Sequence, residues 1–434
     1  MDARVSRRGL LGGATAAGVA GAVAGCSPKK SPTRGVAGAP PLDPSSWDSV
    51  RAQFALRPGV AHLATFVFAT HPAIVREAID RHRQGLDADP YGYLGQHEAR
   101  LDEVAAASAA QYLNTWRNQV ALTDSTTMGL GLVYTGLRLR PGEDILTTEH
   151  DFYATHESLR LRAARDGVTV RRARLYTDPA KASTDEIVTS LLAQVRPQTR
   201  IVAVTWVHSS TGVKLPIRAI ADGLRTRNSQ ALLCVDGVHG FGAQDANPEQ
   251  LGCDFLISGC HKWLFGPRGT GLVWGSSAGW GRLTPVIPAF ERTSIGNWMG
   301  LSAGTVPPGQ AATPGGYHSF EHRWALAEAF TFHQRLGRAR VAARTAELAT
   351  ALKNGLAGVS GVRLATPMSP DLSSGIVCCS LPKVEVGEAV DRLRAADVIA
   401  SATPYNPSLL RFGTSILNTE RDVSAAVAAV RRLV

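Results

Sequence analysis

Residues 254–271 read Asp-Phe-Leu-Ile-Ser-Gly-Cys-His-Lys-Trp-Leu-Phe-Gly-Pro-Arg-Gly-Thr-Gly, and they carry the strongest signal in the chain. The apolar run that ends at Ser258 predicts a strand, and Lys262 follows it in a glycine-rich turn. Ligands bind at the carboxyl ends of strands in mainly parallel sheets, so we expect Lys262 at the ligand-binding edge. The alternative for a lysine in such a turn is a surface position.

A second apolar run, residues 231–235, ends in Asp236, and His239 follows three residues later. An acid and a lysine at the ends of neighbouring strands suit a pyridoxal phosphate site. There the lysine bonds to the cofactor aldehyde and the carboxylate keeps the pyridine nitrogen protonated. The cofactor phosphate needs a helix N-terminus with small hydroxyl side chains, and residues 123–129, Thr-Asp-Ser-Thr-Thr-Met-Gly, offer one.

Helical and strand patterns alternate between residues 72 and 274. Helices are expected at 72–86, 98–113, 127–137, 156–166, 184–195 and 217–226. Strands are expected at 119–122, 144–147, 168–172, 201–207, 231–235, 255–258 and 271–274. Runs such as 201–207 show no polar alternation, which is typical of strands buried on both faces. The pattern predicts an α/β fold with a mainly parallel seven-stranded sheet between helices.

The C-terminal part of the chain predicts a smaller α+β domain. Residues 276–316 are rich in glycine and proline and are expected to form loops. A long helix (324–357), a strand (375–380), a helix (386–395) and a final helix from Thr419 follow. We therefore expect an N-terminal arm with the large cofactor-binding domain over 51–315 and a small domain over 316–434.

Composition narrows the class of protein. The chain has 434 residues, of which 44% are hydrophobic and 19% charged, so a large core can form. The formal charge is +10, but no run of Lys and Arg with interleaved aromatics occurs, so no nucleic-acid partner is expected. No two cysteines have the CxxC spacing, which argues against a metal site. Cys378 and Cys379 are expected to be small core residues.

The first 26 residues predict an export signal. Arg7 and Arg8 precede a short apolar run, as in twin-arginine signals, and Val23-Ala24-Gly25-Cys26 is similar to a lipobox. Lipidation of Cys26 would hold the protein at the membrane surface of the cell envelope. The alternatives are ordinary cleavage of the signal, and a cytoplasmic protein in which the arginine pair occurs by chance. Residues 27–50 are expected to be a linker.

The chain resembles class V aminotransferase-type, fold-type I pyridoxal-phosphate enzymes over roughly residues 55–430. The likeness is greatest to the isopenicillin-N-epimerase-like branch, which also resembles cysteine desulfurases. The motifs that carry the resemblance are Asp236-Gly-Val-His239, His261-Lys262-Trp263 and Arg411-Phe-Gly-Thr-Ser-Ile-Leu-Asn418-Thr419.

The resemblance implies a role for each matched residue. Lys262 would bind the cofactor covalently and shuttle a proton at the substrate Cα. Asp236 would pair with the pyridine nitrogen, and Arg411 would bind the substrate α-carboxylate. His150 occupies the place of the ring-stacking residue, with Phe152 as the alternative.

The remaining cofactor contacts follow from the same resemblance. The residues expected near the phosphate are Ser125, Thr126, Thr127, Ser258 and His261, and those near the cofactor ring are His239 and Ser209. The alternatives are plain structural roles: a core or turn histidine, a helix cap, or, for Arg411, a surface ion pair. Trp263 is expected to pack rather than to take part in chemistry.

The sequence departs from the pattern of its relatives at three places. Residues 400–408 contain no cysteine, so persulfide transfer as in desulfurases is not expected. Tyr317 stands where many relatives have a threonine that reaches the partner subunit's phosphate. Leu63-Ala64-Thr65 replaces a segment in which many relatives have an asparagine.

These features predict a pyridoxal-phosphate enzyme that acts at the Cα of an α-amino acid or peptide-like metabolite, as an aminotransferase or epimerase. The alternatives are a β-lyase or oxidative deaminase on an amino-acid conjugate, and a lipid-anchored binding protein without catalysis. Epimerisation needs a second acid or base, for which Tyr405, His71 and His318 are candidates. The resemblance also implies a homodimer.

Overall fold

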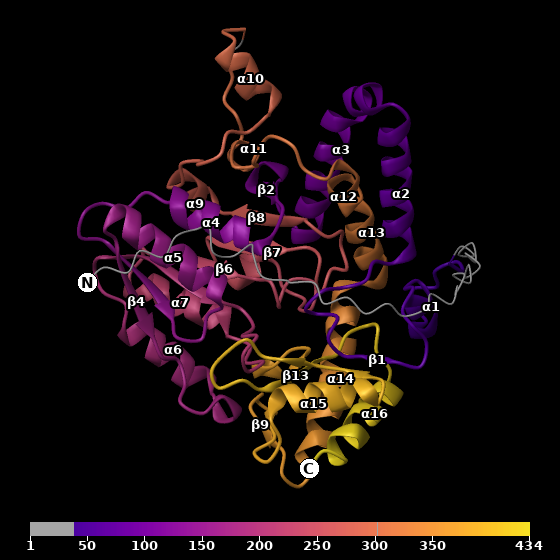
Figure 1. Ribbon diagram of the computed structural model, residues 1–434. Helices are drawn as coiled ribbons and strands as arrows, with labels where there is room; N and C mark the ends of the chain where they lie inside the picture. The colour runs from indigo at the N-terminus through magenta and orange to yellow at the C-terminus, as the bar shows by residue number, and fades with distance from the viewer. Residues whose placement is uncertain (1–38, 302) are drawn as a thin grey trace, which may run out of the picture. The chain divides into compact units, whose positions relative to one another are not determined.

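This computed structural model describes residues 39–301 and 303–434. Their largest sheet has seven strands (Figure 1). The strand order is β2-β8-β7-β6-β5-β3-β4, and β8 alone runs antiparallel to its neighbours β2 and β7. The strands are β2 (Val120–Thr123), β3 (Asp144–Thr148), β4 (Thr169–Ala173), β5 (Thr199–Thr205), β6 (Leu232–Asp236), β7 (Phe255–Gly259) and β8 (Gly271–Gly275). The predicted mainly parallel α/β fold is therefore confirmed. The export signal predicted over 1–26 lies outside the described residues.

Helices cover both faces of this sheet. They are α2 (Ala73–Ala88), α3 (Pro90–Leu113), α4 (Thr126–Gly136), α5 (Tyr153–Asp166), α6 (Thr184–Ala193), α7 (Ile217–Arg227) and α8 (Pro248–Leu251), whereas α1 (Trp47–Ala52) packs in a separate cluster. Alternate residues of a strand point to opposite faces, so Cys234 packs in the core beside α4 and α5, whereas Leu233 and Val235 pack in the core beside α3, α6 and α7. Helices α2 and α3 lie side by side in Figure 1. Double burial explains why the strand sequences are continuously apolar.

The C-terminal part forms a second, antiparallel sheet. Its order is β12 (Ser401–Ala402), β13 (Leu410–Gly413), β10 (Ile376–Ser380) and β9 (Arg363–Leu364), and β1 (Ala61–His62) pairs with β11 (Val398–Ile399). Helices α14 (Arg338–Ala357), α15 (Val386–Ala395) and α16 (Glu420–Arg431) enclose a separate core with this sheet. The division into domains at residue 315 stays a prediction.

Two predictions about this region are wrong in detail. The long helix expected over 324–357 consists of α12 (Phe320–Trp324), α13 (Leu326–Leu336) and α14. Gly337 separates α13 from α14 with φ 81°, a positive φ that glycine adopts readily and that a helix cannot continue through. The expected loops of 276–316 contain the short helices α9 (Ser277–Gly281), α10 (Arg292–Trp298) and α11 (Pro308–Ala311).

No helix within 39–301 and 303–434 combines the length and apolarity that crossing a bilayer requires. The same residues contain no group of three metal-ligating side chains close enough to share an ion.

Candidate active site

The predicted lysine and acid lie at the carboxyl ends of neighbouring strands. Asp236 is the last residue of β6, which pairs with β7, and Lys262 follows β7 by three residues. The Asp236 side chain is buried and accepts a hydrogen bond from the Val238 N–H at 3.0 Å. Burial raises the pKa of Asp236 to about 6. Burial also lowers the pKa of Lys262 to about 8, with Asp236 opposing that shift.

His239 connects Lys262 to Trp263. His239 Nε2 lies 3.4 Å from Lys262 Nζ, and His239 Nδ1 accepts a hydrogen bond from the Trp263 indole at 3.2 Å. Burial, together with the cations Lys262 and Arg411, holds the pKa of His239 well below its ordinary value, so the ring is neutral. His239 is therefore part of the lysine site rather than a remote core histidine.

The predicted phosphate-binding residues meet at the N-terminus of α4. Ser125 caps this helix by accepting from the Met128 N–H at 3.1 Å, and Thr126 Oγ1 accepts from the Gly259 N–H at 2.7 Å. Thr127 is exposed on the first turn. A Cβ at Gly259 would lie 2.8 Å from the His261 ring and 3.1 Å from Thr126 Oγ1, so glycine keeps this space open.

Ser258 and His261 differ in how well they fit the predicted phosphate contact. The Ser258 hydroxyl is fully buried and donates to the Gly259 carbonyl at 3.0 Å, which leaves it a structural role. His261 Nδ1 is buried and has no hydrogen-bond partner among the described residues. Its free nitrogen is the group that a bound phosphate would satisfy.

Arg411 lies in β13 and reaches the large sheet. Its Nη1 donates to the Ser209 carbonyl at 3.0 Å and its Nε to the Ser401 hydroxyl at 3.2 Å. The guanidinium carbon lies 4.9 Å from the Phe66 ring centroid, and 6% of the residue is exposed. No carboxylate pairs with Arg411 among the described residues, so the surface ion-pair alternative is wrong and the charge is available to an anion.

His150 lies at the turn after β3, where its ring stacks on Tyr176 with centroids 4.0 Å apart. Its Nε2 accepts the Leu175 N–H at 3.2 Å, and burial lowers its pKa. The imidazole is thus a neutral, fixed aromatic surface, as a ring-stacking residue requires. Phe152, the alternative, is 37% exposed and contacts the ring of Tyr405 edge-on.

Of the three candidates for a second acid or base, only Tyr405 shares its surroundings with Arg411. Tyr405 Oη lies 2.8 Å from Ser209 Oγ, and burial raises the pKa of Tyr405 to about 12. His71 instead contacts the carbonyl of Phe265, and His318 contacts its own loop at Gly316.

Two residues of this region were missed in the sequence. Phe66 contacts the rings of His239 and Trp263 as well as Arg411, at centroid distances of 6.0 and 6.1 Å for the two rings. Asp151 is buried after β3, where it accepts from the Thr147 hydroxyl and the Thr148 N–H. Asp151 could have been found from the sequence, because it is an acid that directly follows the candidate His150. Phe66 could not, because all its contacts with the site come from residues distant in sequence.

These residues fit pyridoxal phosphate. Asp236 is a buried carboxylate that pairs with no cation through a hydrogen bond among the described residues. The unpartnered Nδ1 of His261 belongs to a ring that lies, with Thr126 at the start of α4, around Gly259. Thr205 Oγ1, whose residue pairs with Asp236 across β5 and β6, is buried and unpartnered within the described residues. When bound, the cofactor supplies a ring that accepts electrons from the substrate Cα.

The cysteines do not offer a nucleophile. All five cysteines of the described residues are buried, and burial raises the pKa of Cys378 and, to about 12, that of Cys379. A thiolate is the reactive form, so burial disfavours reaction at these side chains. For Cys378 and Cys379 this is the core position that the sequence predicts.

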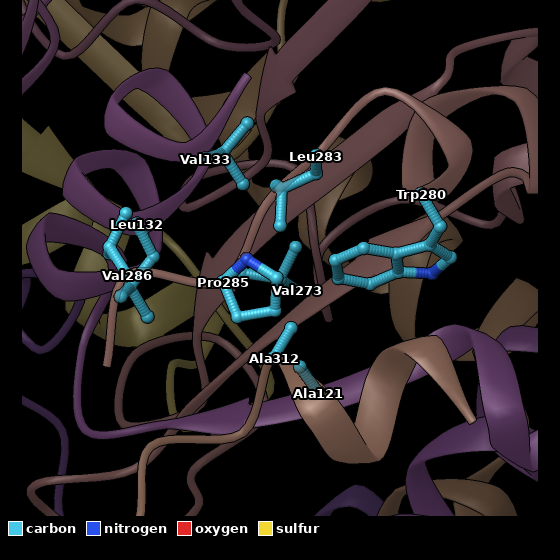
Figure 2. A pocket seen from close by; sticks show the side chains of 9 residues that line it. All are labelled: Ala121, Leu132, Val133, Val273, Trp280, Leu283, Pro285, Val286 and Ala312. Carbon is cyan, nitrogen blue, oxygen red and sulfur yellow. The ribbon is translucent and has the colours of Figure 1, made fainter. Parts of the chain in front are cut away.

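Two cavities lie apart from the lysine. Figure 2 shows a small apolar one, lined by Ala121, Leu132, Val133, Val273, Trp280, Leu283, Pro285, Val286 and Ala312. A larger groove of about 930 Å³ runs between α3, α10 and residues 310–323. Neither includes Lys262, Asp236 or Arg411 in its lining.

The strand order, the lysine after β7 and the acid at the end of β6 define a pyridoxal-phosphate enzyme of the α/β type. The family model "Aminotransferase class-V" matches residues 92–425, so the chain belongs to this family of pyridoxal-phosphate-dependent enzymes.

Relatives and solved structures agree with this assignment. The chain is 27% identical over 406 residues to isopenicillin N epimerase of Streptomyces clavuligerus, covering 90% of this chain and 98% of the relative. It is 28% identical over 408 residues to the isopenicillin N epimerase of Amycolatopsis lactamdurans (90% and 99% covered). A probable cysteine desulfurase of Xylella fastidiosa is 26% identical over 340 residues (75% and 78%).

Among solved structures, the cystine C–S lyase C-DES superposes with a TM-score of 0.77 at 20% identity, covering 86% of this chain and 98% of that chain. A cysteine desulfurase from Escherichia coli gives 0.75 at 22% identity, covering 89% and 98%. At such identities these likenesses establish the shared fold.

Proposed function

We propose that the protein acts at the Cα of an α-amino acid or peptide-like metabolite, with Lys262 as the cofactor lysine, and that it is an epimerase or aminotransferase of the isopenicillin-N-epimerase type. The observation that carries this proposal is the buried Arg411, which has no carboxylate partner among the described residues and lies in the electrostatic environment of Lys262. An unpaired buried guanidinium favours a carboxylate ligand. The two epimerase relatives span nearly the whole chain and agree with this reading.

The chain's own residues divide the work. Arg411 binds and orients the α-carboxylate of the substrate. The buried carboxylate of Asp236 stabilises a positive charge on the cofactor ring. Lys262 Nζ has a pKa of about 8, so near neutral pH it can both take up and return a proton. Tyr405 keeps its proton at neutral pH and can donate it from a second position.

Tyr405 favours epimerisation over simple transamination, because inversion needs a proton donor on each side of Cα. A desulfurase-type reaction is not favoured, since the described cysteines are buried with raised pKa values. The β-lyase or oxidative deaminase remains the second candidate, and the fold shared with the C–S lyase C-DES is consistent with it.

The first test is the visible absorption of the purified protein with added pyridoxal phosphate. The wild type is expected to show a band that Lys262→Ala abolishes. Lys214→Ala is the matched control, because Lys214 is also partly buried but bonds to Gln244 away from the site. A band that survives in Lys262→Ala contradicts the proposal.

The second test is an amino-acid panel in deuterated water. Deuterium at Cα with inverted configuration and without keto acid indicates epimerisation, keto acid with the amine form of the cofactor indicates transamination, and ammonia with pyruvate indicates elimination. Tyr405→Phe is expected to keep Cα exchange and to lose inversion at least tenfold. Equal loss of both would contradict the role of Tyr405.

A homodimer is also part of this proposal. The segment around α10 projects from the sheet in Figure 1 and carries exposed apolar side chains, Phe290 (68%), Trp298 (85%) and Leu301 (76%). Apolar side chains of this size are typical of buried interfaces. Light scattering is expected to give twice the chain mass, and Trp298→Ser with Leu301→Ser to lower it.

We further propose export through the twin-arginine route with lipidation at Cys26. Cell fractionation is expected to find the protein in the envelope, and Cys26→Ser to release it from the membrane fraction. Wild type found in the cytoplasm at full length would contradict export.

A further inference from the structure

Trp263 directly follows the lysine, and its indole bonds to the histidine that faces that lysine. We propose that Trp263 is a positioning residue: it fixes His239 as the tautomer with its proton on Nε2, and thereby favours the neutral amine of Lys262. This inference rests on the proposed role of Lys262 as the cofactor lysine. It assigns Trp263 a chemical effect beyond the packing that its sequence position predicts.

The tautomer follows from the chemistry of the indole. An indole N–H can only donate a hydrogen bond, so His239 Nδ1 must accept it with a lone pair. A neutral imidazole carries one proton, which must then sit on Nε2. That N–H lies toward Lys262 Nζ, 3.4 Å away.

Because His239 Nε2 carries the proton, Lys262 Nζ must accept this hydrogen bond through a lone pair. A neutral amine can accept the Nε2–H, whereas an ammonium would oppose it with another N–H. The charged groups around Lys262 act in both directions, since Asp236 favours the ammonium and Arg411 opposes it. Within the described residues, His261, on the same turn, makes no hydrogen bond to Lys262.

Packing prevents the indole from turning away. Trp263 is 3% exposed and stacks on Phe66 at an interplanar angle of 22°. Gly375 lies against its far edge, where a Cβ would come within 2.5 Å of the ring. The donor thus stays aimed at His239.

The consequence concerns capture of the cofactor. Only the neutral amine adds to the aldehyde of pyridoxal phosphate, and water leaves as the carbon–nitrogen double bond forms. If His239 could turn its lone pair toward Lys262, it would stabilise the ammonium and slow this step near neutral pH.

The wild type tests the tautomer directly. In full-length, cofactor-free protein labelled with ¹⁵N-histidine, the His239 signals, assigned by their loss in His239→Asn, are expected to show a bare Nδ1 and a protonated Nε2. A protonated Nδ1 overturns the proposal, and this measurement needs no tryptophan variant to fold.

The second measurement is the rate of visible-band formation with pyridoxal phosphate against pH. Trp263→Phe keeps the stacking ring and removes the donor, and is expected to move the midpoint up by about one pH unit, roughly tenfold slower capture near pH 7. Trp274→Phe is the matched control, because it is also buried and loses an indole bond, to Thr115 at 2.8 Å.

The outcomes separate the two proposals. An unchanged midpoint in Trp263→Phe overturns the inference and leaves the role of Lys262 intact. Band formation that persists in Lys262→Ala overturns the proposed function itself.

Discussion

Arg411 Nη1 donates to the backbone carbonyl oxygen of Ser209 at 3.0 Å, although 202 residues separate the two in the sequence. Ser209 follows β5 of the seven-stranded sheet, whereas Arg411 lies in β13 of the antiparallel sheet. The candidate carboxylate-binding group is therefore anchored beyond the carboxyl end of β5, the strand that pairs with β6, which ends in Asp236. This contact makes one site from two separate cores.

Arg411→Gln is expected to lower kcat/KM for the amino acid that the wild type turns over by on the order of 100-fold, mainly through KM. The variant loses a charged guanidinium that can donate two parallel hydrogen bonds to a carboxylate. Arg411→Lys should recover only part of the lost kcat/KM, because the lysine ammonium keeps the charge but lacks the planar pair of donors. Steady-state kinetics of Cα exchange measure this. Arg344→Gln is the control, since Arg344 is equally buried but pairs with Glu420. An unchanged KM in Arg411→Gln would refute the assignment.

Ser209→Ala and Tyr405→Phe are expected to destabilise the protein by about 1 kcal/mol each, because both remove the 2.8 Å hydrogen bond between their hydroxyls. The double variant should cost less than the sum of the single ones, with a coupling of about 0.5–1 kcal/mol. Urea unfolding of the four proteins gives the cycle. Strict additivity would mean that the hydroxyl pair contributes nothing.

Asp236→Asn is expected to change the pH dependence of stability in cofactor-free protein. The folded pKa of about 6 exceeds the model-peptide value of 3.8, so the folded state binds more protons between these values and stability falls as pH rises through them. Two pKa units correspond to roughly 3 kcal/mol, which Asn should restore at pH 7. Asp397→Asn, at an exposed ion pair with Arg57, is the control.

The same substitution is expected to weaken pyridoxal phosphate binding by at least tenfold, because a neutral amide cannot stabilise a protonated pyridine nitrogen. Equilibrium dialysis measures this directly. A variant that is less stable at pH 7 yet binds the cofactor normally would contradict both expectations.

Gly413→Ala is expected to destabilise the protein by about 1–3 kcal/mol and to impair the site. A Cβ at Gly413 would lie 2.0 Å from Phe66 Cδ1, so the phenyl ring must leave its place against Arg411 and His239. Gly131→Ala is the control, because nothing lies within 4 Å of its Cβ position in α4, and alanine there should stabilise the helix. Thermal unfolding distinguishes the two, and equal behaviour would rule out the proposed crowding.

Local sequence patterns predicted much of the fold. The helix predicted over 217–226 is α7, and the strand predicted over 255–258 is β7, because apolar periodicity and strand-end glycines are local signals. The break at Gly337 was missed, since the flanking sequences are both helical and only the backbone conformation separates them. The two-residue strands β1, β9, β11 and β12 were missed because so few residues show no alternation.

The sequence alone determined that Asp236 and Lys262 follow neighbouring strands, since in a parallel sheet such ends meet at one edge. Only the tertiary structure decided what surrounds them. Phe66, Trp263 and Tyr405 enter the site through contacts between segments far apart in the chain. The effect of these three side chains on the site depends on interatomic distances and on hydrogen-bond direction. Both are set by the folded chain and cannot be inferred from the order of residues.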